Sequence, residues 1–395
     1  MTSALTVAVH GVEVGILEVF DEYCHRFTFS PAYTKRPVKH RPVLGQIFED
    51  RMPSVIDVAG PMCWFSHLLP QGVMRTWRSR LLGLEVDDEF ELLTYLGEDM
   101  PGAVTLTPGS SPVDRRNASP EKELAKNGDP RFKFSLAGAQ WKLSAQSSGR
   151  GLTTQASGEG RSFIAKFDAP EFPNLPRCEF ATMNWAKHSG ILVPNFDLKT
   201  VSDFDELPDE FPTGSGDVFV IERFDRSDTG RIHVEDFGQI LDRPPGQRQY
   251  QGSYEDIAKV ISWICPQDKS AFVNLLVFNV LCGNGDAHLK NFSVLYPDGR
   301  NARLAPAYDL VSTICFYSPN KEDLALALAG TKYFREIDKP SFAEILRILR
   351  LTDASIVDSA LDRVMQSWND EAVRGEFLPA HAERIDQHLT TLVLN

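Results

Sequence analysis

Apolar and polar positions alternate along residues 5–29, with a break at Gly11. A period of two is typical of a strand with one buried face, so this segment is predicted to form a β-hairpin. Helical spacing follows at 65–82 and 89–96. These elements predict a small N-terminal α/β module.

A polar segment rich in Pro and Gly, residues 108–131, separates this module from the rest and is predicted to be a linker. Strand patterns then dominate up to about residue 226, and helical patterns dominate after about residue 235. The expected strands are 132–137, 140–147, a segment from residue 155 onward, 162–167 and 218–223. The expected helices are 177–189, 268–282, 342–351 and 354–368. An α+β fold follows.

Composition narrows the function. The 395 residues carry a net charge of −13, which argues against a stand-alone nucleic-acid binder, because phosphate neutralisation needs a basic face. The short basic cluster at 75–80 is predicted to be a solvated helix face. The longest apolar run, 272–282, is too short for a bilayer, and the N-terminus lacks signal-peptide features. Six scattered cysteines without a CxxC pair predict reduced thiols in a cytoplasmic protein.

The strongest chemical signal follows the apolar helix predicted to end at residue 282. Asp286 and Asn291 stand five residues apart, which is the D-x-x-x-x-N spacing of kinase catalytic loops. Phosphoryl transfer needs a carboxylate to orient the attacking hydroxyl and an amide oxygen for a metal ion. An Asx/Gly turn between two elements is the alternative, because this spacing is common by chance.

Two further residues strengthen the kinase hypothesis. Asp309 ends a short strand after Asn291, where it could hold a metal ion; the alternative is a carboxylate in an ordinary turn. Lys166 ends an apolar strand, and Glu179 on the next predicted helix is its natural partner. A surface-exposed lysine is the alternative for Lys166.

A loop of small residues precedes Lys142. The sequence Ser-Leu-Ala-Gly-Ala-Gln-Trp-Lys spans 135–142, and its small residues would allow backbone N–H groups to approach phosphate oxygens. Gly158 and Gly160 precede a strand rather than a helix, so they are predicted to form a hairpin turn.

Together, in this order, these motifs resemble the HipA family of bacterial toxin kinases. The matching segments are Ser-Leu-Ala-Gly-Ala-Gln (135–140), Ile-Ala-Lys (164–166), Val-Ile-Glu-Arg-Phe-Asp-Arg (220–226), Gly-Asp-Ala-His-Leu-Lys-Asn-Phe-Ser (285–293) and Ala-Tyr-Asp-Leu (307–310), with 65–72 and 97–104 in the N-terminal module. Two features depart from the family: Gln-Trp stands before Lys142, where an acidic residue is common, and the segment after Asp309 is short.

The resemblance implies a bilobal, protein-kinase-like fold related to the phosphoinositide kinases. The expected parts are an N-terminal subdomain (1–108), a linker (109–131), a β-rich N-lobe (132–226) and a helical C-lobe (227–395).

The resemblance also implies ATP and Mg²⁺ as cofactors and assigns roles to individual residues. Asp286, His288 and Lys290 would be catalytic, and Asn291 and Asp309 would hold the metal. Ser135 would be the site of an inhibitory autophosphorylation. The implied ATP-binding residues are Ala137, Gly138, Ala139, Gln140, Lys142, Lys166, Glu179, Glu222 and Phe224.

For the role of the chain in the cell, the resemblance implies that it is the toxin of a toxin–antitoxin system. The expected substrate is a translation protein such as an aminoacyl-tRNA synthetase, whose phosphorylation arrests growth. The expected partner is a HipB-like helix-turn-helix antitoxin, which would link the chain to DNA only indirectly; no membrane partner is expected. Two alternatives stay open: a corepressor that has lost catalysis, and a small-molecule or lipid kinase on the same fold.

Overall fold

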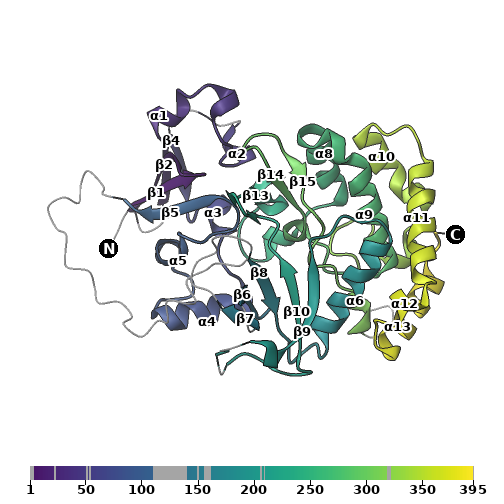
Figure 1. Cartoon of the computed structure of the whole chain (residues 1–395). Coiled ribbons are helices and arrows are strands. Elements are labelled where there is room, and N and C mark those ends of the chain that lie inside the picture. The colour runs from purple at the N-terminus through teal and green to yellow at the C-terminus, as the bar shows by residue number, and fades with distance from the viewer. Residues whose placement is uncertain are drawn as a thin grey trace.

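The chain is described here by a computed structural model, shown in Figure 1. The structure describes residues 4–21, 24–49, 52, 55–109, 140–148, 151–154, 162–204, 207–208, 210–317 and 322–394. The strand expected at 132–137, the strand expected from residue 155 and residues 110–131 of the predicted linker lie outside this part. No helix within the described residues is long and apolar enough to span a bilayer.

The N-terminal module is built on an antiparallel sheet with the strand order β4-β3-β2-β1-β5. The predicted hairpin is present but forms three consecutive strands, and the first turn lies at His10-Gly11, where both residues have positive φ. Such a turn suits the right-handed twist of paired strands. The elements are β1 (Ala4–Val9), β2 (Val12–Asp21), β3 (Cys24–Phe29), α1 (Pro31–Thr34), α2 (Gln46–Glu49), β4 (Val55–Ala59), α3 (Cys63–Ser66), α4 (Gly72–Leu82), α5 (Glu89–Leu96) and β5 (Val104–Pro108).

The single helix predicted over 65–82 is wrong, because the segment forms two helices, α3 and α4. Pro70 lies between them, and a proline disfavours helical backbone at the preceding residue and lacks an N–H group. The solvated face predicted at 75–80 is also wrong in part. Arg78 is only 2% exposed, with its guanidinium 4.8 Å from the centre of the Trp77 ring, whereas Arg80 is exposed. The reason is that α4 packs against a second sheet.

This second sheet has the order β7-β6-β8-β10-β9 and lies between α4 and α6 (Figure 1). Along β10, Val218 and Val220 belong to the core shared with α4, while Phe219 and Ile221 belong to the core shared with α6. The alternation of side chains along a strand thus joins two hydrophobic cores through one sheet. The elements are β6 (Lys142–Ser148), β7 (Gly151–Thr154), β8 (Phe163–Lys166), α6 (Leu175–His188), β9 (Phe196–Thr200) and β10 (Asp217–Glu222).

The remainder is mainly helical, as predicted, and its C-terminal helices lie on the side of α6 away from the second sheet in Figure 1. The predicted helices at 268–282, 342–351 and 354–368 are confirmed as α9, α10 and α11, and nine of the thirteen residues of α9 are buried. In a small sheet, β13-β14-β15, only the last strand was predicted. That strand ends at Leu304 and not at Asp309, which therefore lies in the loop that follows it. The elements are β11 (Arg226–Ser227), β12 (Gly230–Arg231), β13 (His233–Asp236), α7 (Phe237–Ile240), α8 (Tyr254–Ile264), α9 (Lys269–Leu281), β14 (Ser293–Tyr296), β15 (Arg303–Leu304), α10 (Ala343–Leu349), α11 (Ser355–Trp368), α12 (Glu371–Arg374) and α13 (Pro379–Thr391).

Buried polar contacts join the N-terminal module to β13. The carboxylate of Glu235 accepts hydrogen bonds from Trp64 Nε1 at 2.8 Å and from Tyr296 Oη at 2.5 Å. Burial raises the pKa of Glu235 to about 7, although these hydrogen bonds oppose the shift. These buried hydrogen bonds therefore hold the N-terminal module against β13 and β14. Helices and antiparallel sheets together confirm the α+β class, while the predicted domain boundaries stay predictions.

Candidate active site

A cavity of about 640 Å³ lies between the second sheet, α6 and the loops that follow α9 and β15. This volume lies within the range of small-ligand and cofactor sites. The predicted residues Ser135, Ala137, Gly138 and Ala139 lie outside the described residues. All the other predicted site residues line this one cavity: Gln140, Lys142, Lys166, Glu179, Glu222, Phe224, Asp286, His288, Lys290, Asn291 and Asp309.

Lys166 joins the sheet to two acidic groups. It stands at the end of β8, and its ammonium donates to Glu179 Oε1 on α6 and to Asp309 Oδ1. Only 4% of Lys166 is exposed, so the surface-lysine alternative is wrong. Burial alone would lower the pKa of Lys166, but the two carboxylates outweigh it and raise this pKa above the ordinary value. The three groups form a charged cluster inside the cavity.

The two strands that carry the lysines bring them side by side. Lys142 on β6 is paired in register with Lys166 on β8, and cross-strand pairs point to the same face of a sheet. Burial lowers the pKa of Lys142 to about 8, and it raises the pKa of Glu179 to about 7 against the attraction of Lys166. Two neighbouring ammonium groups could bind anionic oxygens.

Asp309 occupies an unusual backbone conformation. Its φ is +53°, in the left-handed region that Asp tolerates better than most residues. Burial would raise the pKa of its carboxyl, but Lys166 and Lys142 outweigh burial and hold this pKa below the ordinary value. The carboxylate therefore stays ionised beside the lysines, as a metal ligand must be.

The loop after α9 holds Asp286 and Asn291 together. Asn291 Nδ2 donates to the Asp286 carbonyl at 2.7 Å and to Asp286 Oδ2 at 3.3 Å. Because both partners are acceptors, Nδ2 must face them, so Oδ1 is the amide atom that could accept from a donor or bind a cation. Directly before Asp286, a Cβ added to Gly285 would lie 2.6 Å from the backbone carbonyl oxygen of Asp323, so this position favours glycine.

The Asp286 carboxyl is 64% exposed, but its exposed surface opens into the cavity. Limited hydration in this recess raises its pKa, while His288 opposes the shift. His288 Nε2 lies 3.6 Å from Asp286 Oδ1, and its ring lies 4.6 Å from that of Tyr250. His288 is thus close to the carboxylate that would orient a hydroxyl.

Lys290 has different neighbours. Its ammonium donates to Asp236 Oδ2 at 2.7 Å and contacts His67 Nδ1 at 3.0 Å. His67 Nε2 lies 2.8 Å from the Arg243 carbonyl, which can only accept, so Nε2 carries the proton and Nδ1 accepts from Lys290. The catalytic role predicted for Lys290 is untested, but its observed contacts tie the loop to the N-terminal module.

Glu222 and Phe224 lie at the end of β10. The Glu222 carboxylate accepts from Asn195 Nδ2 at 2.6 Å, and the Phe224 ring lies 5.3 Å from that of Tyr308. Ile164 and Ile221 add apolar surface to this part of the cavity. Aromatic and aliphatic walls of this kind suit a planar ring.

Trp141, which departs from the family pattern, has a packing role. Its ring centre lies 6.2 Å from that of Trp77 on α4 and 4.8 Å from that of Phe211. It therefore contributes to the core between α4 and the second sheet.

Sequence reasoning missed His67, Asp236 and Tyr250 as neighbours of the site. His67 lies in the segment 65–72 that carried the resemblance, which was the only signal available for these three residues. Their positions depend on how the N-terminal module docks, and no local pattern reports such docking.

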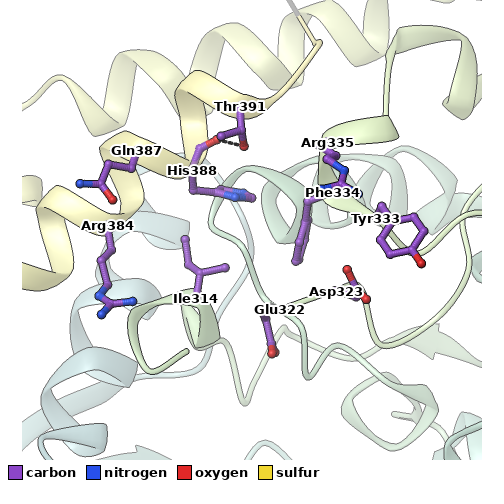
Figure 2. A pocket seen from close by; sticks show the side chains of 10 residues that line it. All are labelled: Ile314, Glu322, Asp323, Tyr333, Phe334, Arg335, Arg384, Gln387, His388 and Thr391. Atoms are coloured by element: carbon purple, nitrogen blue, oxygen red, sulfur yellow. Dashed lines mark hydrogen bonds between the residues drawn. The ribbon is translucent and has the colours of Figure 1, made fainter. Parts of the chain in front are cut away.

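A second pocket, of about 100 Å³, lies beside α13 (Figure 2). It is lined by side chains of both charges, with Glu322 and Asp323 near one end and Arg384 on α13. None of the predicted site residues lines it, and its volume is too small for a nucleotide. The larger cavity is therefore the candidate active site.

An α+β fold with paired lysines, two carboxylates and an amide around one cavity defines a kinase-like class of protein. Comparison with known families gives the same result at full length. The HipA N-terminal domain matches residues 5–107, and the HipA-like C-terminal domain matches residues 134–372. The chain belongs to the HipA family.

Individual relatives cover much or all of the chain. A Sinorhizobium fredii protein named "Putative kinase Y4dM" is 33% identical over 404 residues, which is 99% of this chain and 98% of the relative. The serine/threonine-protein kinase toxin HipA of Shewanella oneidensis is 26% identical over 299 residues, 66% of this chain and 65% of the relative. The solved complex of Shewanella oneidensis HipA with HipB and operator DNA matches with a TM-score of 0.67 at 21% identity, covering 98% of this chain and 96% of that one.

Proposed function

We propose that this chain is an ATP- and Mg²⁺-dependent serine/threonine protein kinase that acts as the toxin of a toxin–antitoxin system. The observation that carries the proposal is the bonding of Lys166 to both Glu179 and Asp309 in the cavity that also contains Asp286 and Asn291. The names of the relatives support a kinase, and one of them is named a toxin.

The cavity has two kinds of lining, and each suits a different part of ATP. The apolar wall of Ile164, Ile221 and Phe224 suits adenine, as expected where the two lobes of a bilobal kinase meet. Lys142 and Lys166, which are paired across β6 and β8, suit the phosphates because their positive charges attract anionic oxygens. On binding, Lys166 would exchange its contact with Asp309 for a phosphate oxygen while it keeps Glu179.

The donor set also fits magnesium. Asp309 offers an ionised carboxylate, and Asn291 offers Oδ1 because its Nδ2 is engaged by Asp286. Hard oxygen ligands of this type are what Mg²⁺ requires, and the bound ion would neutralise the phosphate charge.

The protein groups would then act on the substrate hydroxyl. Asp286 orients the hydroxyl and accepts its proton, and a raised pKa makes this carboxylate a stronger base near neutral pH. His288, beside it, would steady the transferring phosphoryl group. Lys290 would support the loop through His67 and Asp236.

The finer proposals concern partners and regulation. A translation protein such as an aminoacyl-tRNA synthetase is the proposed substrate, and Ser135 is the proposed inhibitory autophosphorylation site. A helix-turn-helix antitoxin is the proposed partner, which is supported by the solved complex of the Shewanella oneidensis relative with HipB and operator DNA.

The decisive experiment compares purified wild-type protein with Asp286→Ala and Asp309→Ala. Both substitutions should abolish Mg²⁺-dependent transfer of the γ-phosphate of ATP and the phosphate on Ser135. Asp362→Ala, which removes an exposed carboxylate on α11, should behave as wild type. If either site variant keeps wild-type transfer and still arrests growth, the kinase proposal is wrong. A corepressor would not need Asp286. That alternative is favoured if the Asp286→Ala variant still gives a gel shift with the antitoxin and still arrests growth.

A further inference from the structure

Three buried side chains from distant segments meet beside the active site. They are Cys178 on α6, Cys315 on the 3₁₀ turn Thr313–Cys315 and His381 on α13. Their sulfur and ring-nitrogen atoms lie within 4.8 Å of one another. Exposure of the three residues is 0%, 6% and 8%. The scattered cysteines of the sequence gave no hint of this cluster, because its members are separated by 137 and 66 positions.

The three side chains make few strong hydrogen bonds with the rest of the protein. The Cys178 thiol contacts the side chains of Cys315, His381 and Thr182. Both thiols also make long contacts to backbone carbonyls, at 3.9 Å from Cys178 to Ser312 and at 3.7 Å from Cys315 to His381. His381 Nδ1 is buried and has no hydrogen-bond partner within the described residues. By contrast, His388 on the same helix bonds to the Val280 carbonyl at 2.9 Å. His233 Nδ1 and His288 Nδ1 also lack a partner among the described residues, so the two thiols beside His381 are what single out this imidazole.

We propose that Cys178, Cys315 and His381 bind one thiophilic d¹⁰ metal ion, Zn²⁺ or Cu⁺. Two thiolates and an imidazole are the ligand types that select these ions. Metal–sulfur bonds of about 2.3 Å and metal–nitrogen bonds of about 2.0 Å would draw the ligand atoms closer by roughly 1 Å. Each thiol loses its proton to solvent on binding, so two thiolates balance a divalent ion and leave no net charge buried.

The cluster lies next to the two carboxylates that pair with Lys166, so a bound ion would affect their positions. Cys178 directly precedes Glu179, and Cys315 lies six residues after Asp309, so two ligands adjoin the two partners of Lys166. A bound ion would tie α6 and the segment after Asp309 to α13. It would thereby hold the carboxylates of Glu179 and Asp309 in position and so support kinase activity. This effect on activity rests on the proposed function, whereas metal binding itself does not.

The pocket of Figure 2 is lined by neighbours in sequence of two of the three ligands, but not by the ligands themselves. Ile314, which adjoins Cys315 in sequence, lines that pocket, and so does Arg384, one helical turn after His381. The cluster is therefore close in the chain to residues that line a recess.

The test uses the full-length chain, purified in a non-thiol reductant and loaded separately with Zn²⁺, Co²⁺ as a spectroscopic probe, or Cu⁺. The proposal expects one ion per chain by elemental analysis and a thiolate-to-cobalt charge-transfer band. Competition between Zn²⁺ and Cu⁺ identifies the preferred ion. Cys178→Ser and Cys315→Ser should each lose the band and the bound ion. Cys265→Ser, which alters a buried cysteine outside the cluster, should keep both.

X-ray absorption of the loaded wild type keeps the proposal falsifiable if a serine variant does not fold. Two sulfur scatterers and one nitrogen scatterer support the site, whereas a shell of oxygen or nitrogen alone overturns it. Failure of the wild type to retain any ion also overturns it. Asp286→Ala should bind the ion as wild type does, so loss of kinase activity and loss of metal binding are separable results.

Discussion

Lys290→Met removes a buried ammonium while keeping most of the side-chain volume. In the native chain this ammonium is paired with Asp236 at 2.7 Å and with His67 Nδ1 at 3.0 Å. The side chains of Lys290 and Asp236 are only 4% and 11% exposed, so water cannot replace the lost contacts. Lys290 and His67 are 223 positions apart, and the contact joins the active-site loop to the N-terminal module.

The magnitude follows from what the substitution leaves behind. Asp236 would keep the hydrogen bond from the Gln239 amide at 2.8 Å but would lose its cationic partner. Burial would then raise the pKa of Asp236, which Lys290 and His67 now hold below the ordinary value. Breaking a buried pair on one side costs about 3–5 kcal/mol of unfolding free energy. We expect a loss in this range.

The assay is urea unfolding of the full chain, followed by circular dichroism and by tryptophan fluorescence. Lys259→Met is the matched control, because Lys259 pairs with Asp256 at 3.0 Å but is 63% exposed. The control should change stability by less than about 1 kcal/mol. If Lys290→Met costs no more than Lys259→Met, the loop is not held by this contact and the reasoning fails.

Two other predictions concern the core and the module junction. Trp77→Ala should lower the unfolding free energy by about 3–5 kcal/mol, because Trp77 is 4% exposed and packs on Trp141 and Phe211; an unchanged urea midpoint would contradict this packing role. The folded-state pKa of Glu235 is raised from 4.5 to about 7, so its contribution to stability is full below pH 4.5 and is lost as pH rises through about 7. The melting temperature of wild type minus that of Glu235→Gln should therefore fall between pH 5 and pH 8, and a difference independent of pH would refute the assignment.

Much of the secondary structure could be predicted from local patterns. The period of two at 5–29 and the apolar helix near 268–282 are both present, because alternation indicates an element with one buried face and a continuous apolar run indicates an element buried on most sides. The helix over 65–82 failed because proline chemistry at Pro70 overrides helical spacing. The exposure of Arg78 could not be predicted either, since a sheet from a later part of the chain covers it.

The candidate site divides in the same way. The sequence by itself determined the chemical groups: the spacing of Asp286 and Asn291 in one loop, and a lysine at a strand end before a helical glutamate. Only the tertiary structure decided that Lys166 bonds to Asp309, that Lys290 turns toward His67, and that Cys178 meets His381. The physical reason is that local spacing fixes an element and its buried face, whereas contacts between distant segments depend on how the elements pack around shared cores.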